Sequence, residues 1–376
     1  MLRRTVPLLA MLVLAGAAPR GPALPDRDGP VEPGSAAATA TRPSAPPGGT
    51  SWFALPILFW LPETRLGYGA TGGLHFHLDG VQRASNVFLV GAYTLNHQGS
   101  IDVAGDLYLR SGALLNARFR LVHFPDAFYG LGPRSSADAR ESYTRRWGQG
   151  IMGAELPIAG GTLRAGPRLD LRAEEITDLV PGGLLSSGTI EGTDGFTAVG
   201  LGGTVTWDTR DRPLFPRRGS FVQAWALHYP EALGRHREFS VANLEGRIFL
   251  PLGADRVLGG AAYVEQSFGE VPFTVLPKLG STRFLRGWRE GRFRDRAACA
   301  AQTELRVPLV SRIVGTAFAA AGEVAPEVAA FRPDTLRFAG GVGLRYRLTP
   351  EGANIRVDVA QSTAGTEVYV LVLDAF

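Results

Sequence analysis

Apolar and polar positions alternate with a period of two over most of the chain. Between Leu66 and Leu78 the even positions are mostly apolar, and the odd positions carry Gly, Thr and His. The same alternation recurs over residues 199–208, 302–307, 337–347 and 354–360. A period of two places successive side chains on opposite faces of a β-strand. The pattern therefore predicts strands that have one apolar face and one small or polar face.

About sixteen such strands follow one another, and no helical period intervenes to cover their apolar faces. Their opposite faces carry several arginines. A sheet with a lipid-facing exterior and a watery interior accounts for both observations. The sequence therefore predicts an all-β fold, a transmembrane antiparallel β-barrel of about 16 strands. The expected strand centres are Ala54, Thr71, Leu89, Gly105, Phe119, Met152, Leu169, Thr204, Ala224, Asn243, Ala262, Glu304, Phe318, Gly341, Val357 and Val370.

The connections between these strands differ in length in a regular way. Transmembrane barrels have short periplasmic turns and longer extracellular loops. If the first strand starts in the periplasm, the odd-to-even connections face outward, and these include the long ones at residues 125–141, 174–195 and 268–297. The even-to-odd connections are mostly short, at residues 157–161, 251–255, 308–312 and 349–353.

Residues 1–17 have the pattern of a secretory signal peptide. Arg3 and Arg4 give it a positive start, and the apolar run over residues 6–14 is too short to span a bilayer. Residues 15–17, Ala-Gly-Ala, form a small-residue cleavage site. We therefore expect an exported chain that is cut after this site.

Residues 18–50 are rich in Pro, Ala, Gly and Ser and have no hydrophobic period. This composition is typical of a disordered tether, and the segment is too short for a domain with its own core. The expected organisation is therefore a signal peptide (1–17), a tether (18–50) and a transmembrane β-barrel (51–376).

Charge and composition exclude several functions. The chain has 39 Lys and Arg against 35 Asp and Glu, but no basic helix or stripe concentrates the charge, so no nucleic acid is expected. Cys299 is the one cysteine, which excludes an intrachain disulfide. His75 and His77 share a strand face, but two ligands without a third do not make a metal site. No G-x-S-x-G elbow occurs, so we expect no enzyme. We also expect no metal and no cofactor.

Three stretches carry more than the alternation. Residues 207–219 read Trp-Asp-Thr-Arg-Asp-Arg-Pro-Leu-Phe-Pro-Arg-Arg-Gly, a strand end followed by a proline-fixed turn and a new strand. Residues 285–295 read Leu-Arg-Gly-Trp-Arg-Glu-Gly-Arg-Phe-Arg-Asp. Residues 340–346 read Gly-Gly-Val-Gly-Leu-Arg-Tyr, and residues 355–358 read Ile-Arg-Val-Asp. In this order and spacing the stretches resemble the bacterial surface antigen superfamily of outer-membrane barrels, over residues 52–376.

The resemblance implies roles for individual residues in the second stretch. In the family, an Arg-Gly-aromatic tip belongs to a long extracellular loop that folds back into the lumen, and Arg286, Gly287 and Trp288 match it. Because an arginine in a partly dehydrated lumen needs a carboxylate, Glu304 is the expected partner that pins the loop.

A second family acid is expected one strand further on. Ala320 occupies that position, and Glu323 has the opposite parity. The pin is therefore either the single pair of Arg286 with Glu304 or an arrangement of a different kind.

The first stretch matches the periplasmic turn of the family, and the last residue matches another family feature. Phe376 resembles the terminal aromatic by which outer-membrane barrels are recognised for insertion, which implies the barrel assembly machinery as a partner, although Asp374 departs from that signal. The residues that match the turn are Asp208, Arg210, Asp211, Pro213, Phe215, Pro216 and Gly219.

The superfamily contains the BamA and TamA assembly proteins and the transporters of two-partner secretion. The resemblance therefore implies an outer-membrane location among lipids and a role in the insertion or translocation of proteins or lipids. Such members usually carry periplasmic repeat domains that receive clients, and residues 18–50 do not resemble one. Client polypeptides and a separately encoded soluble partner are the expected partners.

A passive or gated pore for anionic solutes is the alternative function. Arginines favour anions when they line a channel. The arginines expected to line the lumen are Arg110, Arg120, Arg247, Arg306, Arg337, Arg345, Arg347 and Arg356.

Overall fold

The computed structural model describes residues 50–81, 84–158, 162–212, 215–348, 354–372 and 375. The expected signal peptide, the expected tether apart from Thr50, and both Pro213 and Phe376 lie outside the described residues.

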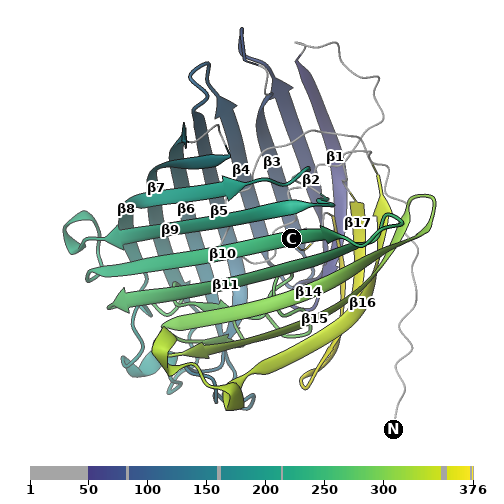
Figure 1. Ribbon diagram of the computed structural model, residues 1–376. Helices are drawn as coiled ribbons and strands as arrows, with labels where there is room; N and C mark the ends of the chain where they lie inside the picture. Colours follow the sequence, from purple (N-terminus) through teal and green to yellow (C-terminus); the bar gives the residue numbers. More distant parts are fainter. Residues whose placement is uncertain are drawn as a thin grey trace.

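Sixteen strands form one closed antiparallel barrel, in which each strand pairs with its neighbours in the chain and β1 meets β18 (Figure 1). The strands are β1 (Ser51–Leu61), β2 (Arg65–Phe76), β3 (Ser85–Thr94), β4 (Gly99–Tyr108), β5 (Leu114–Phe128), β6 (Glu141–Ile158), β7 (Leu163–Thr177), β8 (Phe196–Asp208), β9 (Gly219–Tyr229), β10 (Phe239–Pro251), β11 (Val257–Gly269), β14 (Ala297–Val310), β15 (Ile313–Ala325), β16 (Arg337–Arg347), β17 (Asn354–Ser362) and β18 (Gly365–Val372). Each expected strand centre lies in a different barrel strand, which confirms the expected count and order.

Two further strands, β12 (Lys278–Leu279) and β13 (Phe293–Arg294), pair with each other inside the connection from β11 to β14. Four short 3₁₀ helices lie in other described connections: Leu185–Ser187, Glu231–Leu233, Val328–Ala330 and Pro333–Thr335. The described part of the chain holds no helix that is long and apolar enough to cross a membrane.

The two faces of the sheet differ as the alternation predicts. On β2 the apolar side chains of Tyr68 and Leu74 are exposed on the outside, whereas Thr71 and His75 are buried on the inside. On β8 Leu201 is likewise exposed on the outer face. A lipid-facing apolar exterior explains why so many large hydrophobic side chains are exposed.

The connections also follow the expected asymmetry, with one correction. The long connections, residues 129–140, 178–195 and 270–296, all leave the same end of the barrel, which we take as the extracellular end. Pro125 was expected to begin a loop, but it lies inside β5 and faces Thr144 of β6. The same correction applies to Glu174, which lies inside β7 and faces Phe196 of β8. The β5–β6 ladder is longer than the pattern predicts because it continues beyond the apolar band.

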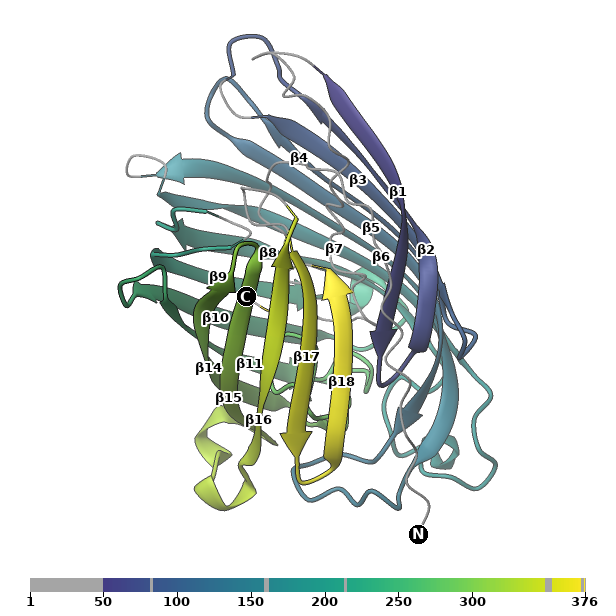
Figure 2. The same cartoon turned by 90° about the vertical axis from the view of Figure 1, so that its right-hand side faces the viewer.

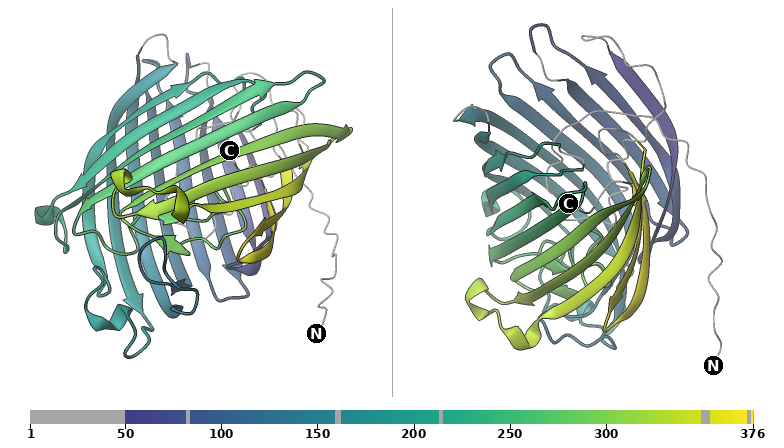
Figure 3. Two further views of the ribbon diagram at one scale, coloured as in Figure 1. Left: turned by 60° about the horizontal axis from the view of Figure 1, so that its bottom comes forward. Right: turned by 45° about the vertical axis from the view of Figure 1, so that its right-hand side comes forward.

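The core lies inside the barrel, where the β11–β14 connection packs against the inner wall. Val275, Leu279 and Leu285 of this connection are fully buried. Phe284 and Trp288 belong to a cluster with inward-facing residues of β11, β14, β15 and β16. The expected loop folded into the lumen is therefore present, and Figure 3 shows it inside the sheet that surrounds it.

The barrel closes weakly between its first and last strands. Among the described residues, β1 and β18 are in register at one pair, Trp60 with Val370. Every other neighbouring pair of barrel strands is in register over at least eight residue pairs. Figure 2 shows β1 and β18 diverging from this contact. We call this junction the seam.

Candidate functional site in the barrel lumen

The lumen loop, residues 270–296, reaches its tip by turns that its own sequence favours. The Ser281 hydroxyl oxygen accepts hydrogen bonds from the backbone N–H groups of Arg283 and Phe284, at 3.1 and 2.9 Å. A serine hydroxyl that accepts from backbone N–H groups two and three residues later favours a turn through contacts within the segment itself. Gly287 then has a φ of 105°, a region that glycine enters without a Cβ penalty.

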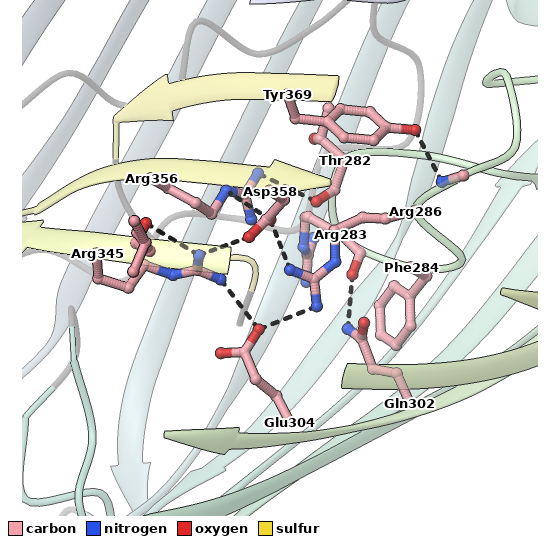
Figure 4. Close-up of polar contacts among 12 residues, drawn as sticks. Thr282, Arg283, Phe284, Arg286, Gln302, Glu304, Arg345, Arg356, Asp358 and Tyr369 are labelled. Atoms are coloured by element: carbon pink, nitrogen blue, oxygen red, sulfur yellow. Dashed lines mark hydrogen bonds and ion pairs between the residues drawn. The ribbon is translucent and has the colours of Figure 1, made fainter. Parts of the chain in front are cut away.

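The tip arginine sits between two carboxylates. Arg286 donates from Nη2 to Glu304 on β14 at 3.0 Å, and from Nη1 to Asp358 on β17 at 2.7 Å (Figure 4). The side chains of all three residues are 0% exposed. The Arg286 guanidinium also lies 3.5 Å from the ring centroid of Phe318 on β15. Charge-assisted hydrogen bonds of this kind are the strong ones, so the tip is held on several strands at once.

Backbone and indole groups of the tip add contacts with the last strands. The backbone N–H of Gly287 donates to the hydroxyl of Tyr369 on β18 at 2.8 Å, and the Gly287 carbonyl accepts from the hydroxyl of Ser362 at 2.7 Å. The indole N–H of Trp288 donates to the carbonyl of Phe338 on β16 at 3.1 Å. The tip therefore rests on the wall formed by β14 to β18.

Three more arginines share the same two carboxylates. Arg345 on β16 donates to Glu304 at 3.1 Å and to Asp358 at 2.5 Å. Arg306 on β14 donates to Glu304 at 3.1 Å. Arg356 on β17 lies 3.5 Å from Asp358 and donates to the carbonyl of Thr282 at 3.1 Å. We call the set of Arg286, Arg306, Arg345, Arg356, Glu304 and Asp358 the lumen cluster.

The periplasmic turn between β8 and β9 reaches the same cluster. Arg306 donates from Nη1 to the carbonyl of Pro216 at 3.2 Å, and its guanidinium lies 4.6 Å from the ring centroid of Phe215. Arg306 therefore contacts the turn with one part of its guanidinium and Glu304 with another. The three stretches that indicate the family, which lie far apart in the chain, meet in the lumen cluster.

The other residues expected in the turn shape it locally. Asp208 accepts two hydrogen bonds from the Arg210 guanidinium, at 2.9 and 2.8 Å. One oxygen of Asp211 accepts from the backbone N–H groups of Arg217 and Arg218, at 2.9 and 3.3 Å. Gly219 has a φ of 101° where β9 begins.

The second acid of the pin is not where the family pattern indicates. Ala320 lies in the apolar cluster that contains Trp288. Glu323 accepts a hydrogen bond from the hydroxyl of Thr335 and so holds the β15–β16 connection. Asp358, two strands further along the wall, takes the place of the missing acid at Arg286.

The opposite side of the lumen loop contacts the N-terminal wall. Arg294 donates to Asp126 of β5 at 3.2 Å, and Arg289 lies 3.4 Å from the same carboxylate. The backbone N–H of Glu290 donates to Glu63, in the connection between β1 and β2, at 3.0 Å. The loop therefore contacts β18 through Tyr369 and the connection that follows β1 through Glu63, on the two sides of the seam.

Burial favours the neutral form of two carboxyl groups outside the barrel strands, those of Glu290 and Glu63. It raises the pKa of Glu290 to about 8, with Lys278 opposing the shift and Glu63 and Asp126 adding to it. Burial likewise raises the pKa of Glu63, against the hydrogen bond from Glu290 and the charge of Arg289. Glu290 is therefore largely neutral at pH 7, which spares the loop a repulsion between neighbouring carboxylates.

The arginines that the sequence places in the lumen divide into three groups. Arg306, Arg345 and Arg356 belong to the lumen cluster, and Arg120 pairs with Asp102 at 2.9 Å on the other wall. Arg110 and Arg347 instead donate to the carbonyls of Asp79 and Ser311, in the turns after β2 and β14. The remaining two contact other groups: Arg247 binds Glu245, and Arg337 donates to the carbonyl of Pro133.

Sequence reasoning missed four residues that hold the loop: Glu63, Asp126, Asp358 and Tyr369. The alternation already places Asp358 on the inner face, beside Arg356. No sequence pattern indicates that the loop tip reaches as far as β17. Within the described residues, no group of three His, Cys, Asp or Glu side chains is placed to hold a metal ion.

These observations define the class of protein: a 16-stranded outer-membrane β-barrel with a loop pinned in its lumen. The sequence matches the Omp85 superfamily domain over residues 165–367, so the chain belongs to this superfamily, and the family indicated by the three stretches is confirmed. No curated protein sequence matches the chain at a significant level.

Solved structures share the fold. One is BamA from Haemophilus ducreyi lacking POTRA domains 1–3, with a TM-score of 0.60, 15% identity, and coverage of 87% of this chain and 70% of that one. CdiB from Escherichia coli has a TM-score of 0.57 and 13% identity, with coverage of 89% of this chain and 64% of that one. CdiB from Acinetobacter baumannii has a TM-score of 0.55 and 10% identity, with coverage of 86% of this chain and 59% of that one. The chain thus spans less than two thirds of either CdiB chain.

Proposed function

We propose that this barrel inserts or translocates polypeptide chains at the outer membrane by opening its seam, and that the lumen loop controls the opening. The observation that carries the proposal is that, among the described residues, β1 and β18 are in register at one pair, Trp60 with Val370. A ladder of one pair has few hydrogen bonds to break, so this junction opens at the lowest cost of any in the barrel.

The open edge of β1 is suited to a client strand. Over residues 53–59 the described register of β1 is with β2, and an unpaired edge is a template for another chain. Pro56 lies in this stretch, and proline is found on strands whose missing donor faces an edge. It removes one donor and so limits uncontrolled pairing without closing the edge.

The lumen loop supports the proposal because it links the two sides of the seam. Its tip contacts β18 through Tyr369, and Glu290, just after the tip, contacts Glu63 in the connection between β1 and β2. Movement of the loop would therefore release both edges together. The family resemblance suggests client polypeptides, with or without a separately encoded soluble partner, as what the seam receives.

A disulfide across the seam tests this function. Facing residues of antiparallel strands have Cα atoms about 4.5–5.5 Å apart, within the range that a disulfide accepts. Trp60→Cys with Val370→Cys, in a Cys299→Ser background, should therefore cross-link on oxidation. The readout is the rate at which a small eight-stranded barrel protein, diluted from urea, folds into vesicles that contain the variant. We expect the stimulated rate to disappear on oxidation and to return with reductant.

The matched control is Tyr68→Cys with Tyr93→Cys, which joins β2 to β3 on the same outer face. This disulfide should leave the rate unchanged, because the two strands are already paired along their length. The alternative, an anion pore that never opens sideways, is favoured by the four arginines around two acids in the lumen cluster. It predicts no stimulation by any variant and an anion conductance that the seam disulfide does not alter.

A further inference from the structure

The membrane-facing surface of the barrel has a groove of about 1040 Å³ across β2 to β8. Two rows of cross-strand neighbours border it. The first row runs through Ile101, Leu121, Gly148 and Ala173, and the second through Tyr93, Gly99, His123, Arg146 and Glu175.

Register shows that the groove lies on the outer face. Leu121 and Ile101 are 63% and 53% exposed, and both have the parity of the lipid-facing side chains. Between the two rows lies a row of inward-facing residues that includes Val122 and Trp147. The backbone of this middle row therefore forms the floor of the groove. Inner-face neighbours such as Gln149 do not line it.

Small residues create the hollow. A barrel is convex on its outside, so a depression there requires side chains to be missing. Gly91 and Gly148 stand in the first row and Gly99 in the second, beside larger neighbours such as Leu121 and Tyr93. A Cβ at Gly91 would meet no atom within 4 Å, so open space continues above this position.

One row gives the groove a polar rim at its extracellular side. Arg146 is 57% exposed and lies 3.6 Å from Glu175, whose side chain is 62% exposed. The Arg146 Nε donates to Nδ1 of His123 at 3.4 Å. Both contacts are long and open to water, so they hold the guanidinium weakly. Arginine in such a place is suited to a phosphate.

We propose that the groove binds one acyl chain of an anionic membrane lipid, with the phosphate of its headgroup at Arg146. Seven strands at about 4.8 Å spacing make the groove about 29 Å long. One lipid chain spans half of a hydrocarbon core that is about 30 Å thick, so it fits within this length. The position suits such a lipid, because the apolar row faces the hydrocarbon and the polar row lies at the headgroup level. Glu175 sits beside the phosphate and limits the affinity.

Native mass spectrometry of the full-length barrel in non-ionic detergent tests the proposal. The probes are phosphatidylglycerol and phosphatidylcholine with the same acyl chains. We expect one phosphatidylglycerol to bind about fivefold more tightly than phosphatidylcholine, the preference that one basic residue gives near a membrane surface. Arg146→Gln should abolish this preference and leave the binding of both lipids at the weaker level.

Filling the groove should weaken the binding of both lipids. Gly91→Leu is expected to reduce affinity about tenfold, the equivalent of displacing two buried methylene groups. Gly246→Leu is the matched control, since this outward glycine on β10 also meets no atom within 4 Å of an added Cβ and lies outside the groove. Equal binding by the two leucine variants would overturn the proposal, and so would a wild-type barrel that retains neither lipid or shows no preference between them.

Discussion

The two walls of the barrel hold the same loop in different ways. The C-terminal wall, β14 to β18, receives the tip in the lumen cluster, where Arg286, Glu304 and Asp358 are wholly withdrawn from water. The N-terminal wall holds residues 289–294 of the loop through Asp126 and Glu63. The side chains of Asp126 and Arg289 remain 15% and 26% exposed. Removing one member of a buried charge network is costly, whereas a partly wet contact is cheaper to break. The difference indicates that the loop stays with the C-terminal wall when the walls separate.

The largest effect should come from the tip. Arg286→Met leaves Glu304 and Asp358 with fewer donors in a dry site, so we expect a loss of about 3–5 kcal/mol in the free energy of unfolding, measured by urea titration in detergent. The control is Arg134→Met, which removes an arginine from an ion pair whose members are 75% and 59% exposed. That variant should lose at most about 1 kcal/mol. Equal losses in the two variants would show that the lumen cluster does not anchor the loop.

A smaller effect is expected at the other wall. Asp126→Asn keeps the shape but removes the charge that Arg294 and Arg289 face, at a cost of about 1–3 kcal/mol. Because this contact supports the loop only on the side of β1, single-channel recordings should show more frequent openings than in the wild type. Asp138→Asn, in the exposed β5–β6 connection, serves as the comparison. A quiet channel in Asp126→Asn would mean that the N-terminal wall does not restrain the loop.

The smallest effect is one of pH. The pKa of Glu290 is raised to about 8 in the folded barrel from an ordinary value of 4.5. Its neutral form therefore adds stability that is complete below the ordinary value and is lost as the pH rises through about 8. Between pH 6 and pH 9 we expect the free energy of unfolding to fall as the buried Glu290 carboxyl loses its proton. Glu290→Gln should remove this slope, and an unchanged slope would assign it to another group.

The strands could be predicted from the sequence because their pattern is local. Each strand alternates between lipid and lumen, so residues such as Tyr68 and Thr71 reveal their faces without knowledge of the rest of the chain. The tip of the loop was predicted through the family resemblance, which matches Arg286 and Glu304 to the family pattern. Contact between them still depends on the fold.

The partners of the loop could not be predicted in the same way. Arg286 and Asp358 are 72 residues apart, and their contact depends on how far the loop extends along a curved wall. The acid missing at Ala320 indicated that the arrangement differs from the family pattern, but the sequence alone left open which acid replaces it. Glu63 was hidden for another reason: it lies in a short connection with no periodicity to read.

The carboxylate of Glu304 connects the turn between β8 and β9 with the lumen loop. Its Oε1 accepts from Arg306, which donates to the periplasmic turn at Pro216, and its Oε2 accepts from Arg286 of the extracellular loop. Three hydrogen bonds in series therefore connect the turn between β8 and β9 with the tip of the lumen loop. A displacement of the turn would reach the tip through side chains, without any change in the pairing of the strands around them.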